Sequence, residues 1–215
     1  MYSEEEQIQA IKDWWRENGT SLLVVALVAV LATVGWRWWG GHKANVSLSA
    51  SSSYSELTRL MGEQVQRPSA AGQAAVQAQA ESVIAEHGKT DYASFAYLAL
   101  AQVAVQEEDY SEAVTQLEKL LGTKPDKEVE ATARIRLARV QLELNNADAA
   151  LATLENKLPS AWQSRVLELR GDAYVQQNKV KQARDTYAQA LEQATPQDAA
   201  RSRLQMKHDN LAPTS

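Results

Sequence analysis

Several residue types are missing or scarce in this chain, and each shortage excludes a class of protein. The 215 residues include no cysteine, one phenylalanine and five prolines. Without cysteine the chain has no disulfide framework, no thiolate metal site, no cysteine nucleophile and no sulfur for lipid attachment. The absence of thiols suits an oxidising compartment, but many cytosolic proteins share it, so it does not decide the compartment.

Signatures of catalysis are also missing from the sequence. There is no Gly-x-Ser-x-Gly, no Gly-x-Gly-x-x-Gly and no nucleophile beside a base. Residues 88–90 resemble the end of a phosphate loop, but Val83 stands where such a loop needs glycine. The three histidines are isolated from one another in the sequence, so we expect them at the surface. We expect no catalytic residue, no cofactor and no metal ion, and hence no enzyme.

Positive charge is in short supply as well. Acidic residues outnumber basic ones, and the formal net charge is −5 at pH 7. Binding to nucleic acid needs a basic stripe that displaces counterions from the phosphates. We therefore expect no nucleic-acid partner.

One long apolar run is present near the start of the chain. Residues 19–36 contain no charged side chain, and a helix needs about 20 mostly apolar residues to cross the hydrocarbon core of a bilayer. From Trp15 to Trp36 a helix rises about 32 Å, close to the thickness of that core. We expect a single transmembrane helix over residues 19–39, preceded by an acidic tail over residues 1–18. Aromatic and basic side chains mark its boundaries: Trp14, Trp15, Trp36, Arg37, Trp38 and Trp39.

A cleavable signal peptide is the alternative to a retained membrane anchor. Such a signal has a basic leading region, a shorter apolar core and small residues at the cleavage site. Here the leading tail is acidic and bulky residues stand where cleavage would fall, so an anchor is favoured. Orientation is not decided by charge, because Lys12 and Arg16 on one side balance Arg37 and Lys43 on the other.

The rest of the chain has the pattern of helices. Alanine is abundant, and apolar residues recur every three or four positions. Gly40, Gly41 and a serine-rich run predict a flexible joint over residues 40–53, although the serine run also fits a first helical turn leading to Tyr54. We expect one helical domain over residues 54–211.

Three alanines mark an internal repeat in this domain. Ala113, Ala150 and Ala183 are separated by 37 and 33 residues. Each follows an expected helix with a small residue where two helices would cross: Ala101, Ala138 and Gly171. The pattern resembles the tetratricopeptide repeat, a helix pair of about 34 residues. An ordinary helical bundle in which alanines recur by chance is the alternative.

The tetratricopeptide resemblance implies an all-α fold, in which a right-handed helical-repeat solenoid follows the single N-terminal transmembrane helix. A degenerate helix pair would precede the repeats, and a terminal helix would cap the open end of the stack. The expected repeats cover residues 94–127, 131–161 and 164–197.

The same resemblance assigns a concave face to the first helix of each repeat. We expect partner or client binding at its second, fifth, ninth and twelfth positions. The expected binding residues are Phe95, Leu98, Gln102, Val105, Ile135, Arg139, Leu142, Arg165 and Glu168, with Thr132, Asp172 and Val175 completing the register. An apolar groove of this kind suits extended or helical unfolded segments. The alternative is that Phe95, Leu98 and Ile135 are buried against the preceding helix pair.

The whole layout is similar to the YfgM family, the ancillary subunits of the bacterial Sec translocon. The most specific parts of the resemblance are residues 17–19, 35–37 and 135–141. It implies a single-pass protein of the bacterial inner membrane with a cytoplasmic N-terminus and a periplasmic repeat domain. The implied partners are the SecYEG translocon, the periplasmic chaperone PpiD, and unfolded or newly translocated proteins that are passed to periplasmic chaperones. The N-terminal side would also act on a cytoplasmic response regulator.

Two other classes of function remain as alternatives. One is a structural envelope scaffold that organises membrane complexes without binding client chains. The other is an enzyme whose site matches no known motif.

Overall fold

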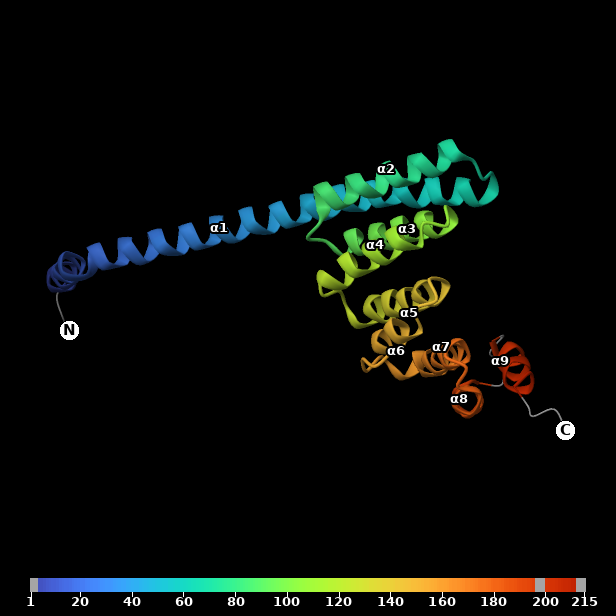
Figure 1. Cartoon of the computed structure of the whole chain (residues 1–215). Helices are drawn as coiled ribbons and strands as arrows, with labels where there is room; N and C mark the ends of the chain where they lie inside the picture. The colour runs from blue at the N-terminus through green and yellow to red at the C-terminus, as the bar shows by residue number, and fades with distance from the viewer. Residues whose placement is uncertain (1–3, 196–199, 212–215) are drawn as a thin grey trace. The chain divides into compact units, whose positions relative to one another are not determined.

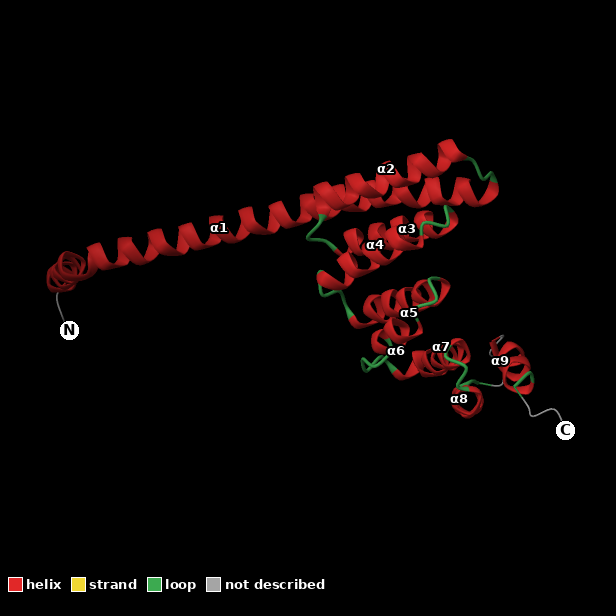
Figure 2. Ribbon diagram, viewed as in Figure 1, coloured by secondary structure: helices red, strands yellow, loops and turns green. Residues whose placement is uncertain are grey.

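The computed structural model describes residues 4–195 and 200–211, without the side chains of residues 4–7, 10–11, 13, 20–23, 26 and 38–47. Every element in this described part is helical (Figure 2). The elements are α1 Glu4–Gln66, α2 Ala70–His87, α3 Asp91–Gln106, α4 Tyr110–Gly122, α5 Lys127–Glu143, α6 Ala147–Thr153, the 3-10 turn η1 Ser160–Trp162, α7 Gln163–Gln176, α8 Val180–Gln193 and α9 Ala200–Asp209. The predicted all-α class is confirmed. The chain divides into two compact units, Met1–Ser49 and Ala50–Ser215.

The first unit contains the predicted membrane segment. Residues 19–39 are helical throughout, as part of α1. Judged on the residues that the structure describes, no helix combines the length and the apolar character that crossing a bilayer requires. The side chains at positions 20–23, 26, 38 and 39 of the predicted segment lie outside the described ones. The transmembrane helix therefore stays a prediction from the sequence.

Residues 40–53, which were expected to form a flexible joint, are helical. Helix α1 continues through them, and the division between the two units falls among them, after Ser49. Ala50 and Leu57 are buried, and Tyr54 packs against the cluster around Leu57. Apolar residues at this spacing lie on one helical face, so burying that face stabilises a helix over a flexible chain.

The second unit is a stack of helix pairs. The end of α1 packs against α2 and α3 through an apolar cluster that includes Leu57, Val76 and Val103. The pairs α3/α4, α5/α6 and α7/α8 follow in chain order, with α9 after them (Figure 1). These three pairs overlap the three expected repeats, and α9 lies where the terminal helix was expected. Four apolar clusters hold successive helices together, which is the packing expected when each repeat contacts only its neighbours.

The turn inside each helix pair has the same geometry in all three repeats. Glu108, Asn145 and Asn178 have φ angles of 60°, 56° and 56°. The amide of the residue after each one donates a hydrogen bond to a carbonyl five positions earlier in the first helix, over 2.8–2.9 Å. This closure satisfies carbonyls that the helix end leaves open. The next helix then starts at a fixed offset, which places Ala113, Ala150 and Ala183 at equivalent buried sites.

Short polar side chains cap the start of four helices. Ser69 caps α2, Asp109 caps α4, Asp126 caps α5 and Asn146 caps α6, each by accepting a hydrogen bond from an amide two or three residues later. Such caps contribute about 1 kcal/mol each, because they satisfy amides with no partner inside the helix. Together the caps and turns set where the first helices lie, and these helices carry the predicted binding residues.

Candidate functional site: a groove along the first helices

Two neighbouring hollows open along the first helices of the repeats. The charged hollow, of about 440 Å³, is lined by α5, α7 and α9. The apolar hollow, of about 410 Å³, is lined by α3, α4 and α5. The two share Arg139 and Glu143, so they form one groove. The predicted binding residues found in its walls are Gln102, Val105, Arg139, Leu142, Arg165, Glu168 and Asp172.

Four of the predicted binding residues are buried: Leu142 and Glu168 at the charged hollow, and Leu98 and Ile135 away from both hollows. Leu98 is 8 % exposed and packs in the cluster between α3, α4 and α5. Ile135 is 5 % exposed and packs in the cluster between α5, α6 and α7. The exposed positions expected for these two side chains are wrong. Both are buried, but each packs with its own helix pair and the following helix rather than against the preceding pair, as the alternative had it. Successive helix pairs must bury apolar surface against one another, and these side chains lie at that contact.

Three further predicted residues lie outside both hollows. Phe95 is partly exposed, and its ring packs against Tyr54 with 5.4 Å between centroids. Val175 is 40 % exposed and Thr132 is half-buried, and neither lines a hollow. A binding role for these residues stays a prediction.

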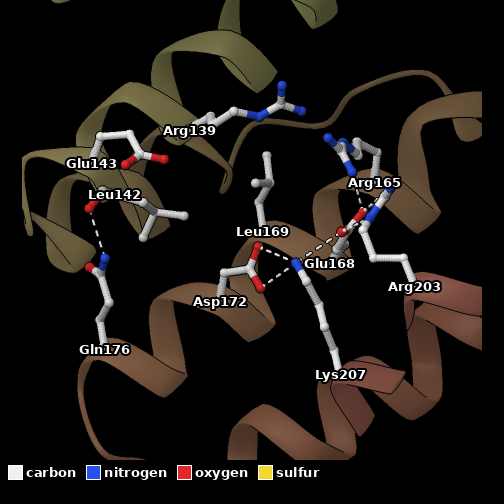
Figure 3. Close-up of a pocket in the computed structure, with 10 residues that line it drawn as sticks. All are labelled: Arg139, Leu142, Glu143, Arg165, Glu168, Leu169, Asp172, Gln176, Arg203 and Lys207. Atoms are coloured by element: carbon white, nitrogen blue, oxygen red, sulfur yellow. Dashed lines mark hydrogen bonds and ion pairs between the residues drawn. The ribbon is translucent and has the colours of Figure 1, made fainter. Parts of the chain in front are cut away.

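The floor of the charged hollow is a buried carboxylate surrounded by cations (Figure 3). Glu168 of α7 is 2 % exposed. Arg203 Nε and Lys207 Nζ each donate to its Oε1 at 2.9 Å, and Arg165 Nη1 donates to its Oε2. Lys207 also donates to both carboxylate oxygens of Asp172, at 2.7 and 2.8 Å. Because Arg203 and Lys207 belong to α9, these bonds fasten the terminal helix to the last repeat.

The environment of Glu168 keeps it ionised. Burial alone would raise the pKa of this carboxyl, because a buried carboxylate loses its hydration. The hydrogen bonds from Arg203 and Lys207 outweigh burial, and with the charges of Lys207 and Arg165 they lower the pKa of Glu168 to about 2. Glu168 is therefore ionised at neutral pH and serves as the internal counter-ion of α9.

Tyr187 of α8 completes this end of the stack. Its hydroxyl donates to Asp172 Oδ1 at 2.6 Å, and its ring is 2 % exposed. Burial and this bond to a carboxylate raise the pKa of Tyr187, so it remains a neutral donor. Asp172 is thereby held between Tyr187 and Lys207.

The apolar hollow draws on residues that sequence reasoning missed. Its walls include Tyr110 and Leu117 of α4 and Val140 of α5, beside the predicted Val105. Two guanidinium groups, Arg136 and Arg139, complete the lining. The prediction used positions on the first helix of each repeat only, so it included no residue of α4. Arg136 lies one position after Ile135, the residue that was predicted. The contribution of Arg203 and Lys207 to the charged hollow also had no local signal, because they lie 35 or more positions after Glu168.

The predicted membrane-boundary residues belong to the first unit. Trp14, Trp15, Trp36 and Arg37 are exposed along α1. The side chains of Trp38 and Trp39 lie outside the described residues. Their role at a membrane boundary stays a prediction.

One histidine lies in a different environment from the one expected. His87 is 7 % exposed at the end of α2, and its Nε2 lies 3.4 Å from Ser53 Oγ. It was expected at the surface, but it is buried beside Ser53 of α1. No group of three or more histidine, aspartate or glutamate side chains in the described part of the chain is arranged to hold a metal ion.

Stacked helix pairs with a groove along their first helices define a helical-repeat domain. A family model described as a tetratricopeptide repeat-like domain matches residues 12–213. The ancillary SecYEG translocon subunit of Escherichia coli (strain K12) is 33 % identical to this chain, over 98 % of this chain and 97 % of that protein. The ancillary SecYEG translocon subunit of Haemophilus influenzae is 29 % identical, over 95 % and 97 %. The chain therefore belongs to this tetratricopeptide repeat-like family, which contains the ancillary SecYEG translocon subunits (YfgM).

Solved structures agree on the fold. The structure of MamA from residue 41 to its end, from Desulfovibrio magneticus RS-1, aligns with a TM-score of 0.54 at 17 % identity. It covers 74 % of this chain and 89 % of its own. At this identity the likeness concerns the helical-repeat fold alone.

Proposed function

We propose that this protein is a membrane-anchored adaptor of the Sec translocon that binds newly translocated proteins and passes them to periplasmic chaperones. The single observation that carries the proposal is similarity to ancillary SecYEG translocon subunits over 98 % of the chain, at 33 % identity. Because the family model starts at residue 12, this similarity takes in the apolar run as well as the repeats.

The membrane anchor in this proposal rests on the sequence. Residues 19–36 lack charge and have tryptophans at both ends, as a helix spanning a bilayer requires. Our proposed topology, with the N-terminus in the cytoplasm and the repeats in the periplasm, rests on the family resemblance, since the flanking charges balance.

Handling of client chains is the part of the proposal that the groove supports. An apolar hollow next to a charged one offers contacts to both kinds of side chain in an extended segment. Partnership with PpiD and action of the N-terminal side on a cytoplasmic response regulator complete the proposal, and both rest on the family resemblance. A scaffold would need no such groove, so the adaptor is the function we favour.

Copurification from gently solubilised membranes tests the proposal directly. The full-length chain should recover SecYEG and PpiD, and a variant with residues 19–39 replaced by an unrelated apolar span of equal length should recover less SecYEG. Such a loss is expected because the aromatic cluster beside Arg37 offers more contact surface than a simple anchor needs. A reporter active only outside the cytoplasm should work when fused after Ser215. Absence of SecYEG from the wild-type sample would overturn the proposal.

A further inference from the structure

We infer that the apolar hollow, together with Arg136 and Arg139, is a binding site for acidic-apolar peptide segments, in which an apolar side chain is followed closely by carboxylates. This inference deepens the proposed function, on which it rests, by naming which segments of a client chain the groove selects. It is carried by an apolar cavity and by two guanidinium groups beside it that have no carboxylate partner among the described residues.

The hollow itself is suited to an apolar side chain. Val105 contributes exposed aliphatic surface and Tyr110 a half-buried ring, and the buried side chains of Leu117 and Val140 lie behind them. Its volume of about 410 Å³ is more than ten times the ~30 Å³ that a water molecule occupies in the liquid. Transfer of an apolar side chain from water to such a surface is favourable in proportion to the area that it covers.

Arg136 is the first cation at the hollow, and it is half-buried. Its Nη1 donates a hydrogen bond to the carbonyl oxygen of Leu98, at 3.4 Å. Burial lowers the pKa of Arg136, and no nearby carboxylate offsets this effect. A guanidinium group that has lost hydration without gaining a counter-ion is a favourable partner for an incoming carboxylate.

Arg139 is the second cation, one helical turn further along α5. It is exposed and lines both hollows. Figure 3 shows no bond between Arg139 and Glu143, although the two are four residues apart on one helix. In the same view the other cations, Arg165, Arg203 and Lys207, are each paired with a carboxylate.

The charge of the residues that line the apolar hollow determines which peptide segments it binds. Two arginines and one glutamate line the apolar hollow, so the charged groups there leave an excess of one positive charge. Arginine binds carboxylates through two parallel N–H groups, which gives direction as well as energy. A segment that carries an apolar side chain alone would leave both guanidinium groups unpaired, and a basic segment would be repelled.

Fluorescence anisotropy with the full-length protein in mild detergent tests the inference. The probes are labelled short peptides in an alanine-serine background: leucine followed by two aspartates, leucine followed by two asparagines, and leucine followed by two lysines. The aspartate peptide should bind about tenfold more tightly than the asparagine peptide, as expected for one charge-assisted contact. Added salt should reduce this difference.

Variants of the protein locate the site. Arg139→Gln and Arg136→Gln should each weaken binding of the aspartate peptide and leave the asparagine peptide nearly unchanged. The matched control is Arg134→Gln, on the same helix. Its Nε is paired with Glu130 at 2.8 Å, and it lines neither hollow. This control removes the same charge from α5 and should bind both peptides as the wild type does.

The outcomes separate this inference from the function on which it rests. Equal binding of the three peptides, or equal weakening by Arg134→Gln and Arg139→Gln, would overturn the acidic-apolar selection. In either case recovery of SecYEG by the wild-type chain would leave the translocon association standing. Loss of SecYEG recovery with selective peptide binding intact would instead overturn the proposed function and keep the site.

Discussion

Gly171 and Tyr187 are in such close contact that no side chain fits between them. A Cβ atom built on Gly171 would overlap the ring of Tyr187, which is 2 % exposed and held by its hydroxyl bond to Asp172. The ring cannot move aside without breaking that bond. Helices α7 and α8 therefore approach each other as closely as they do because position 171 has no side chain.

Substitution of this glycine should destabilise the last repeat. We expect Gly171→Ala to lower the free energy of unfolding by about 2 kcal/mol, because the overlap outweighs the better helix propensity of alanine. Urea unfolding followed by circular dichroism would measure the change. Gly122→Ala is the matched control, since nothing lies within 4 Å of a Cβ built there. If both variants are equally stable, the account of the Gly171–Tyr187 contact is wrong.

Acid should weaken the attachment of α9. The pKa of Glu168 is lowered from 4.5 to about 2 in the folded protein. A lowered folded-state pKa means that the stabilisation is fully present above pH 4.5 and is lost as the pH falls toward 2. We expect Glu168→Gln to cost about 3 kcal/mol at pH 7, because Arg165 and Arg203 lose their counter-ion and Lys207 keeps only Asp172.

The measurement for this prediction is urea unfolding at a series of pH values between 7 and 2. Stability of Glu168→Gln should fall less than that of the wild type across the acid range. The control is Glu118→Gln, at an exposed position on α4. Parallel pH curves for the wild type and Glu168→Gln would contradict the assignment.

Glycine at the first repeat turn should stabilise the protein. Glu108 has φ 60°, a conformation that costs a residue with a side chain about 1 kcal/mol more than glycine. We expect Glu108→Gly to raise the free energy of unfolding by a similar amount. Glu107→Gly is the control, because Glu107 has φ −86° and gains nothing from glycine there. A gain in melting temperature for both variants, or for neither, would argue against this explanation.

Charged substitutions distinguish side chains that lie in the core, such as Leu98 and Ile135, from side chains that line the groove. Leu98→Glu and Ile135→Glu should each destabilise the domain by about 3 kcal/mol or more, since both place a charge in an apolar cluster. Val105→Glu, at a 39 % exposed position in the apolar hollow, should leave helix content and melting nearly unchanged. Thermal melts followed by circular dichroism compare the three. Unfolding by Val105→Glu would place this side chain in the core as well.

Much of the fold could be predicted from the sequence, because helices and turns are formed by residues that are close together in the chain. Alanine spacing predicted the helix pairs, and the pattern around Gly171 marked the close crossing. The groove was harder to predict, because one apolar helix face can point either to the core or to the groove. Leu98 and Val105 lie on the same helix, yet one is buried and the other lines the hollow. The ion pairs between α9 and α7 depend on tertiary packing, so no local sequence pattern predicts them.

The central claim is that the groove of a translocon-bound adaptor contacts newly translocated chains. A photo-crosslinking amino acid placed at Val105 tests it most directly, in cells that hold a secretory polypeptide arrested in the translocon. Glu118 on the outer helix α4 is the control position. The account predicts crosslinks to the arrested polypeptide from position 105 and few or none from position 118. The same crosslinking from both positions, or none from position 105 while SecYEG still copurifies with the chain, would contradict it.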